Sequence, residues 1–193
     1  MKTLPHSFYR RPDVTAIARD LLGKVLATRM GGTRTAGIIT ETEAYAGETD
    51  KASHAYGGKV TGRNRVMYGP GGFAYVYLCY GIHHLFNVVT NRKGTAHAVL
   101  VRSLQPLEGR EEMLRRRGGT KLTTGGPGTL TQALGIRTEH NGADLSGPVI
   151  RIEDHGLRVR EEDVLTGPRI GVDYAGADAL LPYRFRTDIP FPT

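Results

Sequence analysis

The first apolar pattern along the chain has a helical period. Asp13 is well placed to cap a helix, and Gly23 marks its end. The apolar positions between them are Val14, Ile17, Ala18, Leu21 and Leu22. One face of this helix is therefore expected to pack against a core.

From Gly37 the pattern changes to a run of β-forming residues, Ile-Ile-Thr-Glu-Thr-Glu-Ala-Tyr. Side chains alternate between the two faces of a strand, so one face is predicted to carry every second residue of this run. The members of that face are Ile39, Glu41, Glu43 and Tyr45. Two carboxylates and a phenol would then line one surface.

Two apolar runs that meet at Tyr80-Gly81 predict a β-hairpin. The first run, 73–80, follows the Gly-rich connection 69–72, and the second covers 82–89. The turn would place the aromatic ring of Tyr80 at the tip of the hairpin.

The remaining patterns complete an α+β chain. Strands are predicted at 96–102 and 149–152, a basic helix at 107–117, a short helix at 130–134, and a Gly-rich loop at 118–126. The length of 193 residues suits one domain, 1–193. We therefore expect a single compact domain with a curved, largely antiparallel β-sheet, flanking helices and a protruding β-hairpin.

The charge balance favours a polyanionic partner. Lys and Arg number 26 against 19 Asp and Glu, which gives a formal charge of +7 and a pI of about 9.7. The same balance is also compatible with a charge that serves solubility alone. The single cysteine, Cys79, allows no internal disulfide, and no stretch is apolar and long enough to span a bilayer. A soluble, intracellular, cytoplasmic protein without membrane contact is expected.

Several chemistries do not match the sequence. The seven histidines lack the spacing of a zinc hydrolase, and neither a P-loop nor a G-x-G-x-x-G pattern occurs, so no metal and no cofactor is expected. A G-x-S-x-G nucleophile elbow is also missing. Glu41 and Glu43 do not fit a glycosidase pair, because side chains two apart on a strand approach from one side, roughly 6.5 to 7 Å apart. The arrangement that remains is a single catalytic carboxylate that acts with non-acidic partners.

Aromatic and polar residues follow Glu43 in a pattern that suits a flat heterocycle. An enzyme that acts on a base in a duplex must first flip it out, and it then holds the base between aromatic rings. Tyr45, His54 and Tyr77 could supply such rings. Any one of these rings, taken alone, is more often a half-buried structural residue, so the joint pattern carries the interpretation.

The ordered motifs of this chain resemble the alkyladenine DNA glycosylases, also called 3-methyladenine DNA glycosylases. The similarity runs from an opening Phe-Tyr-Arg-Arg-Pro to an Arg-Phe near the end. Its main motifs are Glu41-Thr-Glu-Ala-Tyr45, Ala52-Ser-His54, Arg63-Asn-Arg65, Tyr75-Val-Tyr77, Tyr80-Gly81, Asn87, Leu100-Val-Arg102, Gly126-Pro127 and Arg169-Ile-Gly171.

The resemblance implies catalytic roles for three positions. Glu43 would be the general base that activates water, and Arg102 would help to position that water together with the backbone carbonyl of Ile170. Such an enzyme would need no metal, because a carboxylate can both orient water and stabilise positive charge on the sugar. It would leave an intact abasic site, without lyase activity.

The resemblance also implies how the substrate is held. Tyr45, His54 and Tyr77 would enclose the extruded base, with the backbone around Ala52 and His54 reading its edge. Asn87 would be a steric gate against the amino group of normal guanine.

DNA contacts are implied at two exposed segments. Tyr80 would insert into the duplex, with Ile82 and His83 beside it. Lys59, Thr61 and Arg63 belong to a basic, Gly-rich stretch that would contact phosphates, although a solvated loop is an equally good interpretation.

The expected partner is double-stranded DNA that contains a damaged purine of the 3-methyladenine, 7-methylguanine, hypoxanthine or ethenoadenine class. A monomer without an obligate protein partner is expected. The chain departs from the family at Thr129, where a lysine is usual, and at 176–179, where a segment with Glu-Trp is usual. A non-catalytic nucleic-acid-binding module and a small-molecule nucleosidase remain as alternatives.

Overall fold

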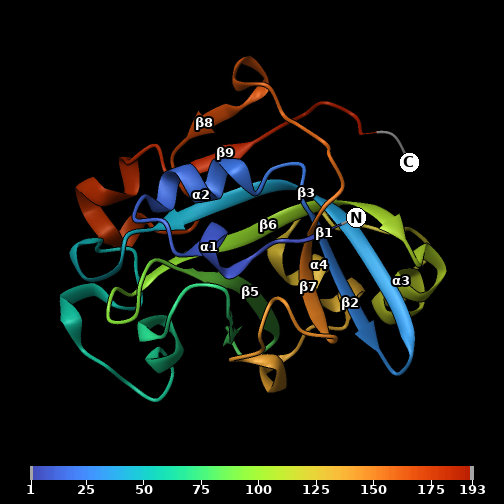
Figure 1. Cartoon of the computed structure of the whole chain (residues 1–193), viewed down its shortest axis with the longest axis horizontal. Helices are drawn as coiled ribbons and strands as arrows, with labels where there is room; N and C mark the ends of the chain where they lie inside the picture. Colours follow the sequence, from blue (N-terminus) through green and yellow to red (C-terminus); the bar gives the residue numbers. More distant parts are fainter. Residues whose placement is uncertain (1, 192–193) are drawn as a thin grey trace.

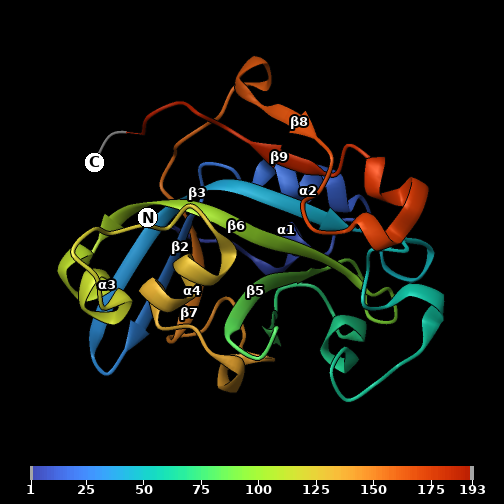
Figure 2. The same cartoon turned by 180° about the vertical axis from the view of Figure 1, so that it is seen from behind.

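The computed structural model describes residues 2–191, and its largest element is an antiparallel β-sheet (Figure 1). Its strands are β1 (Lys2–Thr3), β2 (Val25–Met30), β3 (Thr33–Tyr45), β4 (Ala74–Cys79), β5 (His83–Thr90), β6 (His97–Glu108), β7 (Ile150–Asp154), β8 (Leu165–Gly167) and β9 (Arg184–Arg186). Their order is β1-β7-β2-β3-β6-β5-β4, while β9 joins the second half of β3 and β8 joins β9. The long strands curve, so the sheet curls into a half-barrel (Figures 1 and 2).

Short helices flank the sheet. They are α1 (His6–Tyr9), α2 (Val14–Asp20), α3 (Arg110–Arg117) and α4 (Pro127–Leu134), with 3-10 turns η1 (Gly47–Thr49), η2 (Tyr56–Gly58), η3 (Arg65–Tyr68), η4 (Thr138–His140), η5 (Glu161–Asp163) and η6 (Asp173–Leu180). The predicted cap of α2 is confirmed, because the Asp13 carboxylate accepts hydrogen bonds from the N–H groups of Thr15 and Ala16 at 2.8 and 3.1 Å. The expected α+β fold in one compact domain is likewise confirmed.

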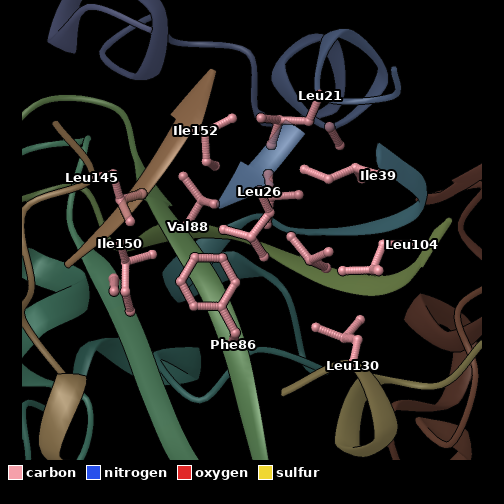
Figure 3. Close-up of a cluster of buried hydrophobic side chains, with 14 of the residues drawn as sticks. Leu21, Leu26, Ile39, Phe86, Val88, Leu104, Leu130, Leu145, Ile150 and Ile152 are labelled. Carbon is pink, nitrogen blue, oxygen red and sulfur yellow. The ribbon is translucent and has the colours of Figure 1, made fainter. Parts of the chain in front are cut away.

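One main hydrophobic cluster joins these elements (Figure 3). The C-cap of α2 contributes Leu21, α4 contributes Leu130, and β5 contributes Phe86, all with no exposed surface. α2 packs on β3 and β6, whereas α4 packs on β5 and β6. The apolar face predicted for the first helix is therefore buried, and both helices contribute to the same core.

The predicted face of β3 is wrong at its first member. Ile39 packs in the main core together with Ala44, so it lies on the side opposite Glu43. The cause is a local irregularity in the β3–β6 pairing: Ile39 faces Leu104, Glu41 faces Ser103, and Thr40 has no partner on β6. An unpaired residue reverses the alternation of side chains along a strand. The second half of β3 therefore directs Glu41 and Glu43 away from the core, while Ala44 remains on the core face.

Other boundaries differ from the predictions in the same region. β6 continues to Glu108, well past the predicted end at 102, so α3 begins at Arg110 and not at 107. β2 and the β8–β9 pair lie in segments for which no strand was predicted. The hairpin is confirmed, with β4 paired to β5 from Ala74 to Cys79. No helix in residues 2–191 is long and apolar enough to cross a membrane.

Candidate active site

Glu43, on the second half of β3, is the most enclosed carboxylate of the site. Its side chain has no exposed surface. One oxygen accepts the N–H of Ile170 at 2.8 Å and lies 3.3 Å from Nη1 of Arg102, and the other accepts the hydroxyl of Tyr45 at 2.9 Å. Burial raises the pKa of Glu43, while Arg102, Ile170 and Tyr45 oppose that rise by stabilising the charged form. The carboxylate is thus buried and hydrogen-bonded at both oxygens.

A second carboxylate, Glu41, anchors the arginines around Glu43. Oε1 of Glu41 lies 3.2 Å from Nε of Arg102 and 2.6 Å from Nε of Arg184 on β9. Arg102 therefore bridges the two glutamates of β3. The bulge near Thr40 makes this possible, because it turns both glutamates away from the core.

A cavity of about 670 Å³ opens in front of this network. Its walls include Tyr45, Arg102 and Ile170, so these residues stand between Glu43 and the open space. Aromatic rings from β4 and the η1–η2 loop line the other side: the centroids of His54 and Tyr77 are 4.7 Å apart, and those of Tyr75 and Tyr77 are 5.3 Å apart. This volume and its aromatic walls suit a planar ligand.

His54 is uncharged at neutral pH. Desolvation among the tyrosine rings, and after it the positive charge of Arg63, lower the pKa of His54 to about 4. Nδ1 of His54 lies 2.8 Å from the hydroxyl of Tyr75. The Arg63 guanidinium, at 4.8 Å, covers the ring of Tyr77. The aromatic wall is therefore an ordered set of neutral rings with one cation at its rim.

The residues predicted to recognise the edge of the base line the same cavity. Ala52 and Asn87 both line it, and both are almost fully buried. The amide of Asn87 donates to the carbonyl of Tyr75, its cross-strand neighbour, at 3.1 Å. The carbonyl of Ala52 accepts the hydroxyl of Tyr174 at 3.1 Å, although Tyr174 is 70 % exposed. Tyr174 was not among the predicted residues.

A buried ion pair ties the loops of the site together. Arg169 and Asp50 form two hydrogen bonds of 2.5 and 2.8 Å, and neither side chain is exposed by more than 1 %. Asp50 also accepts the N–H groups of Ala46 and Ala52, and the Arg169 guanidinium lies 4.8 Å from the ring centroid of Tyr45. This pair therefore fixes one wall of the cavity together with the loop that carries Ala52 and the residue before Ile170.

The hairpin tip stands clear of the domain. Tyr80 is 90 % exposed, and its backbone has a φ of 50°, in the left-handed region that Gly81 also adopts. The N–H of Ile82 closes the turn on the carbonyl of Cys79 at 3.1 Å. Ile82 is 71 % exposed, and His83 is also exposed. Two apolar side chains displayed in this way on a narrow turn are typical of an interaction site.

The predicted phosphate-contacting stretch forms an exposed loop beside the cavity. Lys59, Thr61 and Arg63 are all exposed. Asn64 is buried beneath them and holds the loop, because its amide donates to the carbonyls of His54 and Lys59 at 2.8 and 2.9 Å. The cations of this loop are thus free to contact a partner while its backbone is fixed.

Within residues 2–191, no group of three or more His, Cys, Asp or Glu side chains is arranged to hold a metal ion. Single histidines contact other partners: His54 contacts Tyr75, His6 pairs with Asp144, and His155 pairs with Glu153. His84 lies against the N–H of Thr138, and His97 lies against the side-chain amide of Asn91.

Comparison with known proteins identifies the family of this chain. The sequence profile of the methylpurine-DNA glycosylase family matches residues 7–189. The chain belongs to the methylpurine-DNA glycosylase family. It is 48 % identical over 186 residues to a protein from Chlamydia abortus and 50 % identical over 184 residues to one from Myxococcus xanthus, both with names that describe a 3-methyladenine DNA glycosylase. These alignments cover 94 and 95 % of this chain and 96 and 89 % of the relatives.

A third relative with such a name, from Methanocella arvoryzae, is 46 % identical over 188 residues, which is 96 % of this chain and 92 % of that protein. The resemblance in the motifs is thereby confirmed over almost the whole chain. The protein is a DNA glycosylase, a hydrolase of base-excision repair that acts on damaged bases.

Both positions at which the chain departs from the family motifs make hydrogen bonds in the structure. Thr129, where the glycosylases usually have a lysine, exchanges two hydrogen bonds with the backbone of Gly126, at 3.0 and 2.8 Å, and so closes the first turn of α4. The segment 176–179 lies in η6, where Asp178 accepts the N–H of Lys51 at 2.8 Å. Thr129 thus gives the helix a cap at the rim of the cavity, in place of a positive charge.

The sequence reasoning missed three groups of this glycosylase site. Arg169 with Asp50, Glu41 with Arg184, and Tyr174 all contact predicted residues. The motif Arg169-Ile-Gly171 marked the first group without giving it a role. Arg184 belongs to the Arg-Phe motif near the end of the chain, which likewise gave it no role. For Tyr174 no sequence signal existed, because it reaches the site only through the folding of the C-terminal segment.

Proposed function

We propose that this glycosylase flips damaged purines of the 3-methyladenine, 7-methylguanine, hypoxanthine and ethenoadenine class out of duplex DNA and hydrolyses the bond between base and sugar. The observation that carries the proposal is Glu43: a fully buried carboxylate, held at both oxygens, directly behind an aromatic cavity. A site that only binds bases has no use for a buried charge of this kind, because burying it is costly.

In the proposed reaction the flipped base lies among Tyr45, His54 and Tyr77. Water attacks the anomeric carbon of the sugar, a new C–O bond forms, and the bond to the base nitrogen breaks with its electron pair leaving on the base. Glu43 takes a proton from the water. A cationic alkylated purine leaves as a neutral base, whereas a neutral purine such as hypoxanthine must be protonated as it leaves.

The electrostatics of Glu43 support the role of base. Burial raises the pKa of its carboxyl group, which makes the carboxylate a better proton acceptor than a solvated glutamate. The charge of Arg102 keeps that carboxylate ionised. The same negative charge would stabilise the positive charge that develops on the sugar.

Water must reach Glu43 past the residues that cover it. The contact to Arg102 is the longest of the three at Glu43, 3.3 Å, and Arg102 has a second carboxylate, Glu41, to hold it. We propose that water enters between Arg102 and Glu43, with Arg102 remaining on Glu41. Glu43, Arg102 and the backbone of Ile170 would then surround the nucleophile.

The proposal includes a steric role for Asn87 and an insertion role for Tyr80. Asn87 is fixed in the cavity wall by its bond to Tyr75, so an extra amino group on the base would clash with it. Tyr80, exposed at the tip, would fill the space that the flipped nucleotide leaves.

An intact abasic product is proposed because no lysine lines the cavity in residues 2–191, where the cations are Arg63 and Arg102. Lyase chemistry commonly needs an amine nucleophile. Borohydride reduction during the reaction should therefore trap no covalent complex between protein and DNA.

The test is an excision assay on duplexes that each carry one hypoxanthine, ethenoadenine or 3-methyladenine. After incubation, alkali cleaves any abasic site, and strand breaks should appear only with alkali and only in damaged duplexes. An undamaged duplex and the Glu43→Gln variant serve as controls. If no duplex is cleaved after alkali treatment, the protein is not an enzyme of this specificity.

A further inference from the structure

A second hollow, of about 970 Å³, lies on the opposite side of the hairpin tip from the aromatic cavity. Ile82, His83 and His84, at the start of β5, form one wall. The other walls come from the end of β2, from α3, and from the segment between α4 and η4. We call this hollow the basic groove.

The lining of the basic groove is strongly positive. Arginines at 29, 115, 116 and 137 line it, against one acidic residue, Glu139, whose side chain is 72 % exposed. Arg115 and Arg116 share the carboxylate of Glu112. By contrast, Arg29 donates only to the carbonyl of Gly32, and the Arg137 side chain has no hydrogen-bond or ion-pair partner within residues 2–191.

Arg29 and Arg137 are exposed, so their guanidinium groups are accessible to an external partner. Arg29 and Arg137 lie on separate elements, at the end of β2 and before η4, yet both border the same hollow. Two guanidinium groups across one groove suit an extended polyanion better than a single small anion, because each can contact a separate phosphate.

The basic groove and the aromatic cavity of the candidate active site lie next to each other, with the hairpin between them. The cavity and the groove share His83 and Gly128, so only the hairpin and the start of α4 separate them. A side chain at Gly128 would meet the His83 ring at 2.9 Å, which shows how closely the hairpin packs on α4. In Figure 2, α4 lies on one side of β5 and the blue-green segment that includes the 59–65 loop lies on the other.

We infer that the basic groove binds the phosphate backbone of duplex DNA on the side of the hairpin away from the 59–65 loop. A duplex that meets Tyr80 at the tip must extend to both sides of it, and each side then faces a basic surface: Lys59 and Arg63 on one, Arg29 and Arg137 on the other. The inference rests on the proposed insertion of Tyr80, and it assigns the groove a phosphate-binding role that base recognition does not need.

Binding to a duplex with a stable tetrahydrofuran abasic site tests the inference without requiring turnover. Fluorescence anisotropy at several KCl concentrations gives the affinity and its salt slope. The double variant Arg29→Ala/Arg137→Ala should bind roughly tenfold more weakly at moderate salt, with a slope smaller by about 2, one for each lost phosphate contact. The matched control is Arg158→Ala/Arg160→Ala, on the exposed segment between β7 and β8, which lines neither the aromatic cavity nor the basic groove.

A second measurement shortens the duplex on one side of the lesion at a time. Removing the arm over the groove should weaken binding of the unmodified protein but have little effect on the double variant. An unchanged salt slope in the double variant, or equal sensitivity of both proteins to shortening, would overturn the inference. Loss of DNA binding in the Arg158/Arg160 control to the same degree would also overturn it, because the effect would then be net charge alone.

The outcome is independent of the excision assay. If the protein excises no damaged purine yet the double variant loses its salt slope, the proposed specificity fails and the groove remains a DNA-binding surface. If excision proceeds and the slope is unchanged, the groove inference alone fails. If the double variant binds DNA with unchanged affinity and salt slope but loses affinity for poly-glutamate, the groove binds an acidic protein segment instead.

Discussion

The carboxylate on β3 and the tyrosine at the hairpin tip represent opposite ways of placing a functional side chain. Glu43 has no exposed surface and three polar contacts, whereas Tyr80 is 90 % exposed and stands on a turn held by one backbone hydrogen bond. A group that transfers a proton must be held in a fixed geometry before the substrate arrives. A group that enters DNA gains its contacts only from the DNA.

The surroundings of Glu43 and the hairpin tip should also differ in which property a substitution changes. Changes near Glu43 should alter rate and folding together, because the site shares Asp50, Arg169 and β3 with the domain interior. Changes at the tip should alter binding alone, because Tyr80 contributes little to the core.

The largest effect is expected from Glu43→Gln. The amide keeps the shape of the side chain but cannot accept a proton from water, so the single-turnover rate of excision should fall by about 10² to 10⁴. Lesion binding in a gel shift should survive. Glu162→Gln, on exposed η5, is the matched control and should leave the rate unchanged. Turnover retained in the Glu43 variant would remove this residue from the role of base.

Asp50→Asn should produce the largest loss of stability. It leaves Arg169 buried without its counter-charge, which typically costs about 3 to 5 kcal/mol in the free energy of unfolding. Urea denaturation measures the loss. Asp188→Asn breaks an ion pair with Arg186 that is 41 to 65 % exposed, so it should cost less than about 1 kcal/mol. Equal losses in both variants would contradict the view that Asp50–Arg169 fixes the site.

Tyr80→Ala should affect binding and little else. Losing the inserted ring should weaken affinity for a lesion duplex by roughly tenfold to a hundredfold, because unstacking is then uncompensated. The free energy of unfolding should change by less than about 0.5 kcal/mol. Leu165→Ala, an exposed apolar position on β8, controls for general loss of apolar surface. Unchanged affinity would argue against insertion of Tyr80.

Arg102→Gln should shift the pH dependence of the rate. Glu43 must be ionised to act as base, so activity falls as pH decreases through its pKa. Arg102 lowers that pKa, and its removal should therefore move the acid limb of the single-turnover rate to higher pH. The limb should stay in place in His54→Phe, because the pKa of His54 is already about 4. An identical limb with and without Arg102 would contradict this assignment.

The smallest effect is expected from Thr129→Lys. A positive charge at the cavity rim should tighten DNA binding a few-fold and steepen the salt slope by about 1. The variant also loses the hydrogen bonds to Gly126, which should lower stability by about 1 kcal/mol. Thr129→Ala separates the two effects, since it removes the cap without adding charge. A slope unchanged by the lysine would mean that this rim does not approach phosphate.

The elements predicted from the sequence are those whose patterns are local. The capped helix at 14–20 and the hairpin turning at Tyr80 depend on neighbours within a few residues, and both are present. The short strands β8 and β9 have no such pattern, because they form only when the C-terminal segment pairs with β3. Long-range pairing of this kind leaves no periodic signal in three residues.

The same distinction between local patterns and long-range contacts explains which residues of the site could be predicted from the sequence. Motif residues such as Tyr45, His54 and Asn87 were predicted, and the structure brings them to one cavity. Their roles remain predictions. Arg184 and Tyr174 were missed, because their contacts come from tertiary folding rather than from spacing. The reversal of faces at Ile39 was missed because a bulge depends on the partner strand, here β6, and not on the sequence of β3 alone.

The unpaired Thr40 makes this protein far more vulnerable to a change in chain length than to a change of side chain. Every residue after it in β3, including Glu43, reaches its proper side only because one residue is inserted before it. A deletion of a single codon there would direct two carboxylates towards leucine and valine side chains and expose apolar ones to the cavity. We therefore expect natural variants to tolerate substitution of Thr40 itself but to keep the number of residues between Ile39 and Glu43.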